Sequence, residues 1–183
     1  RISSRLALRT VLHLGHAIAG AVAAVHGAGV IHKDIKPSNL IVVGEKHVRL
    51  NDFGFAVRLA RETARVVAPK RLEGTLAYMA PEQTGRMNRP VDRRSDLYAL
   101  GITLYELATG VLPFNSQNPL DLVHHHIAHI PPSPREHRPE LPRVLADLIL
   151  RLIAKDAEAR YQSAAGVQAD LARCIETLEG DII

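Results

Sequence analysis

One uncharged stretch limits what this chain can fold into, because such a stretch must lie in a protein core or in a membrane. Residues 10–31 contain no Asp, Glu, Lys or Arg. They do contain three histidines and four glycines, which make the stretch less apolar than a typical membrane span. The larger apolar side chains recur at helical spacing, at Leu8, Val11, Leu14, Ile18, Val22 and Val25. We therefore predict a core helix that ends near residues 27–29, and no membrane span.

The composition is that of one globular domain without a nucleic-acid signature. The chain has 183 residues, of which 46% are hydrophobic, and a formal net charge of +4. Aromatic residues make up only 4% and Trp is absent, so we predict no nucleic-acid partner. The single cysteine, Cys174, cannot form an internal disulfide, which fits a reducing, cytoplasmic location.

The remaining pattern predicts a mainly α fold with one small β-hairpin. Two short β-type runs, residues 40–43 and 47–50, surround a turn at residues 44–46. Residues 55–89 are predicted to form a long loop. Helices are expected from Ser95 to Gly110 with a leucine stripe, over residues 119–130 and 144–154, and after a capping Ser163. Residues 131–142 hold five prolines and are predicted to be a rigid connector.

Two motifs bring together the groups that phosphoryl transfer requires. The run His32-Lys33-Asp34-Ile35-Lys36-Pro37-Ser38-Asn39 places a carboxylate, an ammonium and an amide in one short segment. Asp52-Phe53-Gly54 adds a second carboxylate just beyond the hairpin. Carboxylate and amide oxygens suit Mg²⁺, and a cation offsets the charge of a moving phosphate.

Together with Ala80-Pro81-Glu82, these motifs resemble the C-terminal lobe of a eukaryotic-type serine/threonine protein kinase domain, of the bacterial kind. The resemblance covers residues 1–183 and implies an α+β lobe that is mainly helical. It implies ATP and Mg²⁺ as cofactors and a protein Ser or Thr hydroxyl as substrate. Asp34 would orient that hydroxyl, and Lys36 would lie near the transferred phosphate. Asn39 and Asp52 would hold Mg²⁺.

The same resemblance assigns supporting roles near these motifs. His32 would be a structural hydrogen-bonding residue and not a general base. Phe53 would pack under the site, and Gly54 would let the following loop change state. Thr75, after Gly74, would shape the site for a Ser or Thr hydroxyl.

Three residues further along the chain are expected to hold the scaffold. Asp96 would bind the backbone of the catalytic loop. Glu82 would pair with Arg160, and breaking that pair would cost about 3–5 kcal/mol if both charges are buried.

The resemblance stops short of a whole kinase domain. No G-x-G-x-x-G run or Val-Ala-x-Lys strand precedes the catalytic loop. We therefore expect the N-terminal lobe that covers ATP to be absent, and the isolated chain to be inactive. Residues 74–89 and 95–101 resemble large bacterial proteins that join a kinase-like domain to an AAA-type ATPase, often a GAF domain, and a sensor histidine kinase. The missing lobe and those modules of a longer parent chain are the expected partners.

Two other functions stay open. Lys33 stands where many kinases have Arg, and Thr63 is the one hydroxyl residue in residues 55–73. These departures allow a non-catalytic regulatory or docking module. A small-molecule kinase of the aminoglycoside type shares a similar loop but would lack the segment 74–82. The histidines at 124–126 and 129 are interpreted as a solvated helix face and not as a metal site.

Overall fold

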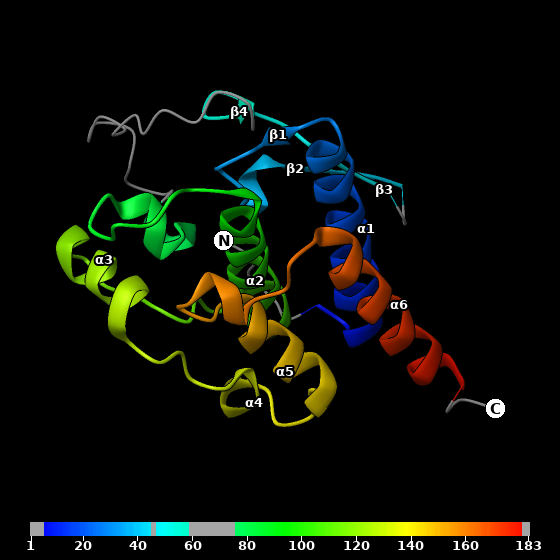
Figure 1. Cartoon of the computed structure of the whole chain (residues 1–183). Helices are drawn as coiled ribbons and strands as arrows, with labels where there is room; N and C mark the ends of the chain where they lie inside the picture. The colour runs from blue at the N-terminus through cyan, green and yellow to red at the C-terminus, as the bar shows by residue number, and fades with distance from the viewer. Residues whose placement is uncertain (1–5, 45–46, 59–75, 181–183) are drawn as a thin grey trace.

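A computed structural model describes residues 6–44, 47–58 and 76–180 of the chain. Helix α2 (Arg93–Thr109) runs through the middle of the molecule, with α1 (Leu8–Gly27), α3 (Pro119–Ala128) and α5 (Arg143–Leu152) around it (Figure 1). Helix α6 (Ala164–Gly180) lies alongside α1, and the short strands gather at one end of the helical body. The described part of the chain is mainly helical, as predicted.

Helix α1 is the predicted core helix, but its buried face differs in detail from the predicted stripe. The buried residues are Val11, Leu12, Gly15, Ile18, Ala19 and Val22, whereas Leu14 and Val25 are only half-buried. Small residues on this face let neighbouring helices approach, because a Cβ on Gly15 would lie 2.9 Å from Leu104 Cδ2. By length and composition alone, α1 is long and apolar enough to span a membrane, a test that core helices of globular proteins also pass. In this structure α1 packs on α6, α2 and β3 (His47–Leu50).

Helix α2 begins earlier than predicted and is buried on all sides. Asp92 caps it by accepting a hydrogen bond from Arg94 N at 2.8 Å, so the helix starts before Ser95. The predicted stripe of Leu97, Leu100, Leu104 and Leu107 is buried, but burial extends beyond it, because every residue from 95 to 105 is buried. The reason is that α2 is surrounded by other elements: a Cβ on Gly101 would lie 2.6 Å from Leu152 Cβ of α5. Gly110, with φ 80°, ends the helix as predicted.

Two antiparallel strand pairs frame the segment that carries the motifs. Strands β2 (Leu40–Val43) and β3 form the predicted hairpin, with Leu40 opposite Leu50. A second pair, β1 (Val30–Ile31) with β4 (Val57–Arg58), was not predicted, because strands this short and this far apart carry no local pattern. The β1–β4 pair brings both ends of this segment together next to the start of α2.

The proline-rich connector contains a short helix that the prediction missed. Helix α4 (Pro134–His137) has a capping box: Ser133 Oγ accepts from Arg135 N, and Ser133 N donates to Glu136 Oε1 at 2.8 Å. The predicted cap of α6 is present, since Ser163 Oγ accepts from Gly166 N at 3.1 Å. Val167 and Leu171 are buried on α6.

His126 of α3 is buried, although the sequence placed it on a solvated face. Its exposed fraction is 1%, and its Nδ1 lies 2.9 Å from the hydroxyl of Tyr98. Burial, and then the charges of Lys155 and His125, lower the pKa of His126 to about 3. The folded chain therefore holds this imidazole neutral at pH values at which the unfolded chain binds a proton.

We expect this histidine to make the chain sensitive to acid. The pKa of this histidine is lower in the folded than in the unfolded chain, so the unfolded chain binds the proton first. The free energy of unfolding is therefore fully retained above the unfolded pKa of about 6.5. It falls as the pH drops from there toward 3, with a slope of up to about 1.4 kcal/mol per pH unit. Denaturant unfolding at several pH values measures this slope. The variant His126→Asn keeps an acceptor for Tyr98 but does not titrate, so its slope must be smaller. Equal slopes in the two proteins would contradict the assignment.

Candidate active site

Asp34, Lys36 and Asn39 form one hydrogen-bonded cluster after β1. One carboxylate oxygen of Asp34, Oδ2, accepts from Lys36 Nζ at 2.8 Å and from Asn39 Nδ2 at 2.8 Å. Asn39 Nδ2 also donates to the backbone oxygen of Asp34 at 2.8 Å. A short 3₁₀ turn, Pro37–Asn39, returns the chain so that the amide reaches back to the carboxylate. We call this group the Asp34 cluster.

The other carboxylate oxygen of Asp34 is unused. Oδ1 is buried and has no hydrogen-bond partner in the described part of the chain. A buried carboxylate oxygen without a donor is costly, so an unpaired one in a native fold calls for an explanation. The cluster therefore contains one buried acceptor without a partner, in a carboxylate that the two hydrogen bonds on Oδ2 hold in place.

Asp96 of α2 holds the loop that carries this cluster. Its Oδ2 accepts from His32 N and its Oδ1 from Lys33 N, both at 2.8 Å, and the side chain is fully buried. Lys33 has φ 67°, a left-handed conformation that is unfavourable for a residue with a long side chain. The two hydrogen bonds that Asp96 accepts stabilise this backbone conformation.

His26, at the end of α1, is a residue of this site that the sequence did not suggest. Its Nε2 lies 2.8 Å from Asp96 Oδ2, and the two residues are far apart in sequence. The imidazole thus donates to the same carboxylate that holds the loop of the Asp34 cluster. A contact over this sequence distance leaves no local signal, so only the fold reveals it.

His32 lies beneath the loop as a hydrogen-bonding residue. Its Nδ1 accepts from Asp34 N at 3.3 Å, and its Nε2 lies 3.1 Å from the backbone oxygen of Asn51. The ring therefore links the loop to the end of β3. Phe53 contacts His32 edge to face, with ring centroids 4.7 Å apart, but its side chain is still 48% exposed.

Asp52 is exposed, and a backbone hydrogen bond connects the residue before it to the Asp34 cluster. The neighbouring Asn51 N donates to Asn39 O at 2.9 Å. Asp52 Oδ1 accepts only a 3.2 Å bond from Gly54 N among the contacts of the described residues. The residue in the left-handed region is Asp52, with φ 59°, whereas Gly54 is not in that region.

The donor set fits Mg²⁺ that arrives with a nucleotide. Asn39 commits its amide nitrogen to Asp34, which leaves its oxygen as the free end, and Asp52 offers an exposed carboxylate. No group of three or more His, Cys, Asp or Glu among the described residues would hold a metal alone. Mg²⁺ commonly uses one or two protein oxygens and completes its shell with phosphate and water.

Glu82 and Arg160 form a buried, two-pronged ion pair. The distances are 2.7 Å from Arg160 Nη1 to Glu82 Oε1 and 3.0 Å from Nη2 to Oε2, and Ser95 Oγ also donates to Oε1 at 2.7 Å.

Gln83, which the sequence did not suggest, donates to Lys33 O and accepts from Ala80 N, both at 3.0 Å. Residues 80–83 are therefore tied to the loop that carries the Asp34 cluster. Thr63 and Thr75 lie outside the described residues.

Comparison with known proteins consistently finds protein kinases. Residues 3–171 match the family described as protein kinase domain. A probable serine/threonine-protein kinase of Clostridium perfringens is 35% identical over 166 residues, which are 91% of this chain and 24% of the relative. Serine/threonine-protein kinase PknB of Mycobacterium tuberculosis is 37% identical over 148 residues, 81% of this chain and 23% of the relative. The chain thus spans about a quarter of the length of these curated relatives.

Proposed function

The chain belongs to the protein kinase family, and we propose that it forms the catalytic lobe of a bacterial serine/threonine protein kinase. The observation that carries this proposal is the unoccupied Oδ1 of Asp34 beside the bonded Oδ2. A carboxylate in this state can accept a hydrogen bond from an incoming hydroxyl without breaking a bond of the fold.

Each residue of the site then has a distinct task. When bound, ATP and Mg²⁺ supply the phosphoryl group and the cation that offsets its charge. Asp34 Oδ1 orients the Ser or Thr hydroxyl for in-line attack. Lys36 lies 2.8 Å from Asp34 and brings a positive charge to the same place, where it stabilises the phosphate in transfer. The Asn39 oxygen and the Asp52 carboxylate would hold the metal. Thr75 selects the class of acceptor hydroxyl.

We propose that the site needs a second part of a longer protein to bind ATP. The sequence has no glycine-rich phosphate loop before its catalytic loop, and the chain spans only about a quarter of its relatives. Ile41, Val42 and Val43 of β2 are each more than 40% exposed, and the preceding lobe would cover such a surface. Downstream ATPase and sensor histidine kinase modules belong to this proposal, as does a cytoplasmic location, where ATP is available.

A regulatory module without catalysis is the second candidate, and the lysine at position 33 favours it. A docking role would not require the hydrogen bonds that hold Asp34, Lys36 and Asn39 in one cluster.

A transfer assay separates the two candidates. A longer protein, in which this chain follows its natural preceding segment, is incubated with γ-labelled ATP, Mg²⁺ and casein. We expect label in casein, and none when Mg²⁺ is omitted or when the 183-residue chain is used alone. Absence of transfer from the longer, folded protein would favour the docking module.

A further inference from the structure

Gln83 connects two segments of the site, and the chemistry proposed above assigns it no task. It belongs to the 3₁₀ turn η5 (Pro81–Thr84) and lies 50 positions after Lys33 in the sequence. Its side-chain nitrogen Nε2 donates to the backbone oxygen of Lys33, and its side-chain oxygen Oε1 accepts from Ala80 N, both at 3.0 Å. One amide therefore contacts the loop of the Asp34 cluster with one end and its own segment with the other.

An amide side chain suits both of these bonds. A backbone carbonyl accepts and a backbone N–H donates, so the side chain at position 83 must donate to the first and accept from the second. Gln does both, whereas an ionised Glu of the same shape only accepts and Met does neither. The backbone reinforces the arrangement, because Gln83 N donates to Ala80 O at 2.9 Å. The turn thus directs the Gln83 nitrogen toward the loop.

The turn that carries Gln83 is itself fixed in the fold. The preceding residue, Glu82, is buried, forms the two-pronged ion pair with Arg160 and accepts a hydrogen bond from Ser95. Gln83 therefore reaches the loop from an anchored position, and its hydrogen bond to Lys33 O restrains the loop and not the turn.

The bond from Gln83 falls on the peptide unit directly before Asp34. The carbonyl of this unit is Lys33 O, and its N–H is Asp34 N, which donates to His32 Nδ1 at 3.3 Å. Rotation of the unit changes ψ of Lys33 and φ of Asp34, and Lys33 is already in the left-handed region with φ 67°. The bond to His32 is longer than is usual for a hydrogen bond to nitrogen, so Gln83 provides the stronger restraint.

We propose that Gln83 is a positioning residue for phosphoryl transfer, which holds the Lys33–Asp34 peptide so that the Asp34 carboxylate can orient the acceptor hydroxyl. In this role Gln83 touches neither the acceptor nor the nucleotide, and it makes the orientation of Asp34 depend on the placement of residues 80–83. The proposal rests on the proposed function of Asp34 and adds a residue through which a second segment controls it.

Gln83→Glu separates the two bonds of the amide. At pH 8 its carboxylate is ionised, so it still accepts from Ala80 N but cannot donate to Lys33 O. In the longer protein we expect kcat for casein phosphorylation to fall about tenfold, because the Lys33 carbonyl loses its donor. The KM values for ATP and casein should change by less than about twofold. Gln83→Met, which makes neither bond, should lower kcat at least as much.

A double-mutant cycle shows whether Gln83 acts through Asp34. In the Asp34→Asn protein the carboxylate that Gln83 positions is already gone, so Gln83→Met should lower the remaining kcat by less than about twofold. A contribution of Gln83 to stability alone would lower kcat by the same factor with either residue at position 34.

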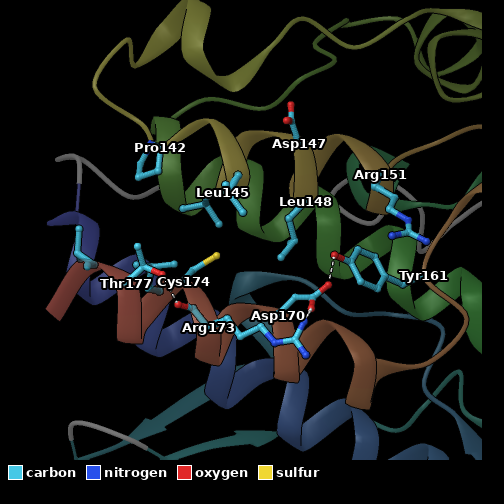
Figure 2. Close-up of a pocket in the computed structure, with 13 residues that line it drawn as sticks. Pro142, Leu145, Asp147, Leu148, Arg151, Tyr161, Asp170, Arg173, Cys174 and Thr177 are labelled. Carbon is cyan, nitrogen blue, oxygen red and sulfur yellow. Dashed lines mark hydrogen bonds and ion pairs between the residues drawn. The ribbon is translucent and has the colours of Figure 1, made fainter. Parts of the chain in front are cut away.

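Two variants control for the loss of a hydrogen bond as such. Thr84 Oγ1 donates to Pro81 O at 2.6 Å inside the same turn, and among the described residues its side chain makes no hydrogen bond to the loop of the Asp34 cluster. Thr177 donates to Arg173 O at 2.9 Å and lines a pocket between α5 and α6, none of whose lining residues belongs to that loop or to the turn (Figure 2). Neither Thr84→Val nor Thr177→Val should change kcat by more than about twofold.

Amide hydrogen exchange tests the same link without any activity. Exchange is followed by NMR on the ¹⁵N-labelled 183-residue chain. The Asp34 amide should exchange at least about fivefold faster in Gln83→Met than in the parent chain, and at the parent rate in Thr84→Val. If the longer protein transfers no phosphate, the proposed function is wrong, and the exchange rate still decides whether Gln83 holds this peptide.

Three results would overturn the proposal. The first is a kcat in Gln83→Glu and Gln83→Met that equals that of the parent protein. The second is an equal effect of Gln83→Met with Asp or Asn at position 34. The third is an unchanged exchange rate of the Asp34 amide in Gln83→Met.

Discussion

Replacing Asp34 by Asn in the longer protein is expected to lower kcat for phosphate transfer by about 10²–10⁴-fold. Asn has nearly the same shape, so the loop keeps its place, but the carboxylate that would orient the hydroxyl is gone. Lys36 also loses its 2.8 Å ionic partner. The KM for ATP should change much less than kcat, because Asp34 is proposed to contact the acceptor and not the nucleotide.

Ser38→Ala is the matched control for this variant. Ser38 lies in the same loop, its side chain is exposed, and it makes no hydrogen bond within the described part of the chain. Its kcat should stay within about twofold of the parent protein, as for other neutral surface substitutions. If Asp34→Asn unfolds at the same temperature as the parent and keeps its kcat, the proposed role of Asp34 is wrong.

Replacing Arg160 by Met is expected to lower the free energy of unfolding by about 3–5 kcal/mol. The change leaves Glu82 buried, with Ser95 as its remaining side-chain donor, and takes away the hydrogen bonds that Arg160 makes to the backbone oxygens of Ala154 and Lys155. Denaturant unfolding of the 183-residue chain measures the loss.

Arg89→Ala provides the comparison with an exposed pair. Arg89 lies 2.6 Å from Asp156, and both side chains are about half exposed. Its loss should cost much less than the loss of Arg160, because water screens an exposed ion pair. Removing both buried charges, as in Glu82→Leu with Arg160→Met, should recover part of the stability that Arg160→Met loses. Equal losses for Arg160→Met and Arg89→Ala would mean that burial does not set the strength of the Glu82–Arg160 pair.

The sequence predicted those elements whose pattern lies within a short run of neighbouring residues. The hairpin of β2 and β3 was predicted at its observed bounds, because two β-type runs surround a glycine turn. The missed helix α4 also had a local signal, since Ser133 and Glu136 have the spacing of a capping box after a proline-rich start. That signal was hidden by the prolines around it.

Long-range packing set the features that the sequence could not predict. Helix α2 was expected to be amphipathic, but neighbours on every side bury Tyr98 and Ile102 as fully as Leu97. His126 was expected in solvent because it lies among other histidines, and the approach of Tyr98 removes it from water.

The candidate site also combines contacts between sequence neighbours with contacts between distant segments. Asp34, Lys36 and Asn39 are close in sequence, so their residue types and spacing are enough to indicate one cluster. Gln83 binds the loop of the Asp34 cluster and His26 binds Asp96, which holds that loop; both come from distant segments, and no pattern around them reveals these contacts. The unused oxygen of Asp34 is likewise a property of the folded loop and not of its sequence.

The chemical identity of the phosphorylated product tests the central proposal most directly. The longer protein is incubated with γ-labelled ATP, Mg²⁺ and casein, and the labelled casein is hydrolysed in acid so that its phosphoamino acids can be separated. We predict label in phosphoserine or phosphothreonine, and its loss in Asp34→Asn. Label in phosphotyrosine, or equal label in the parent protein and in Asp34→Asn, would contradict the assignment of this chain as the catalytic lobe of a serine/threonine kinase.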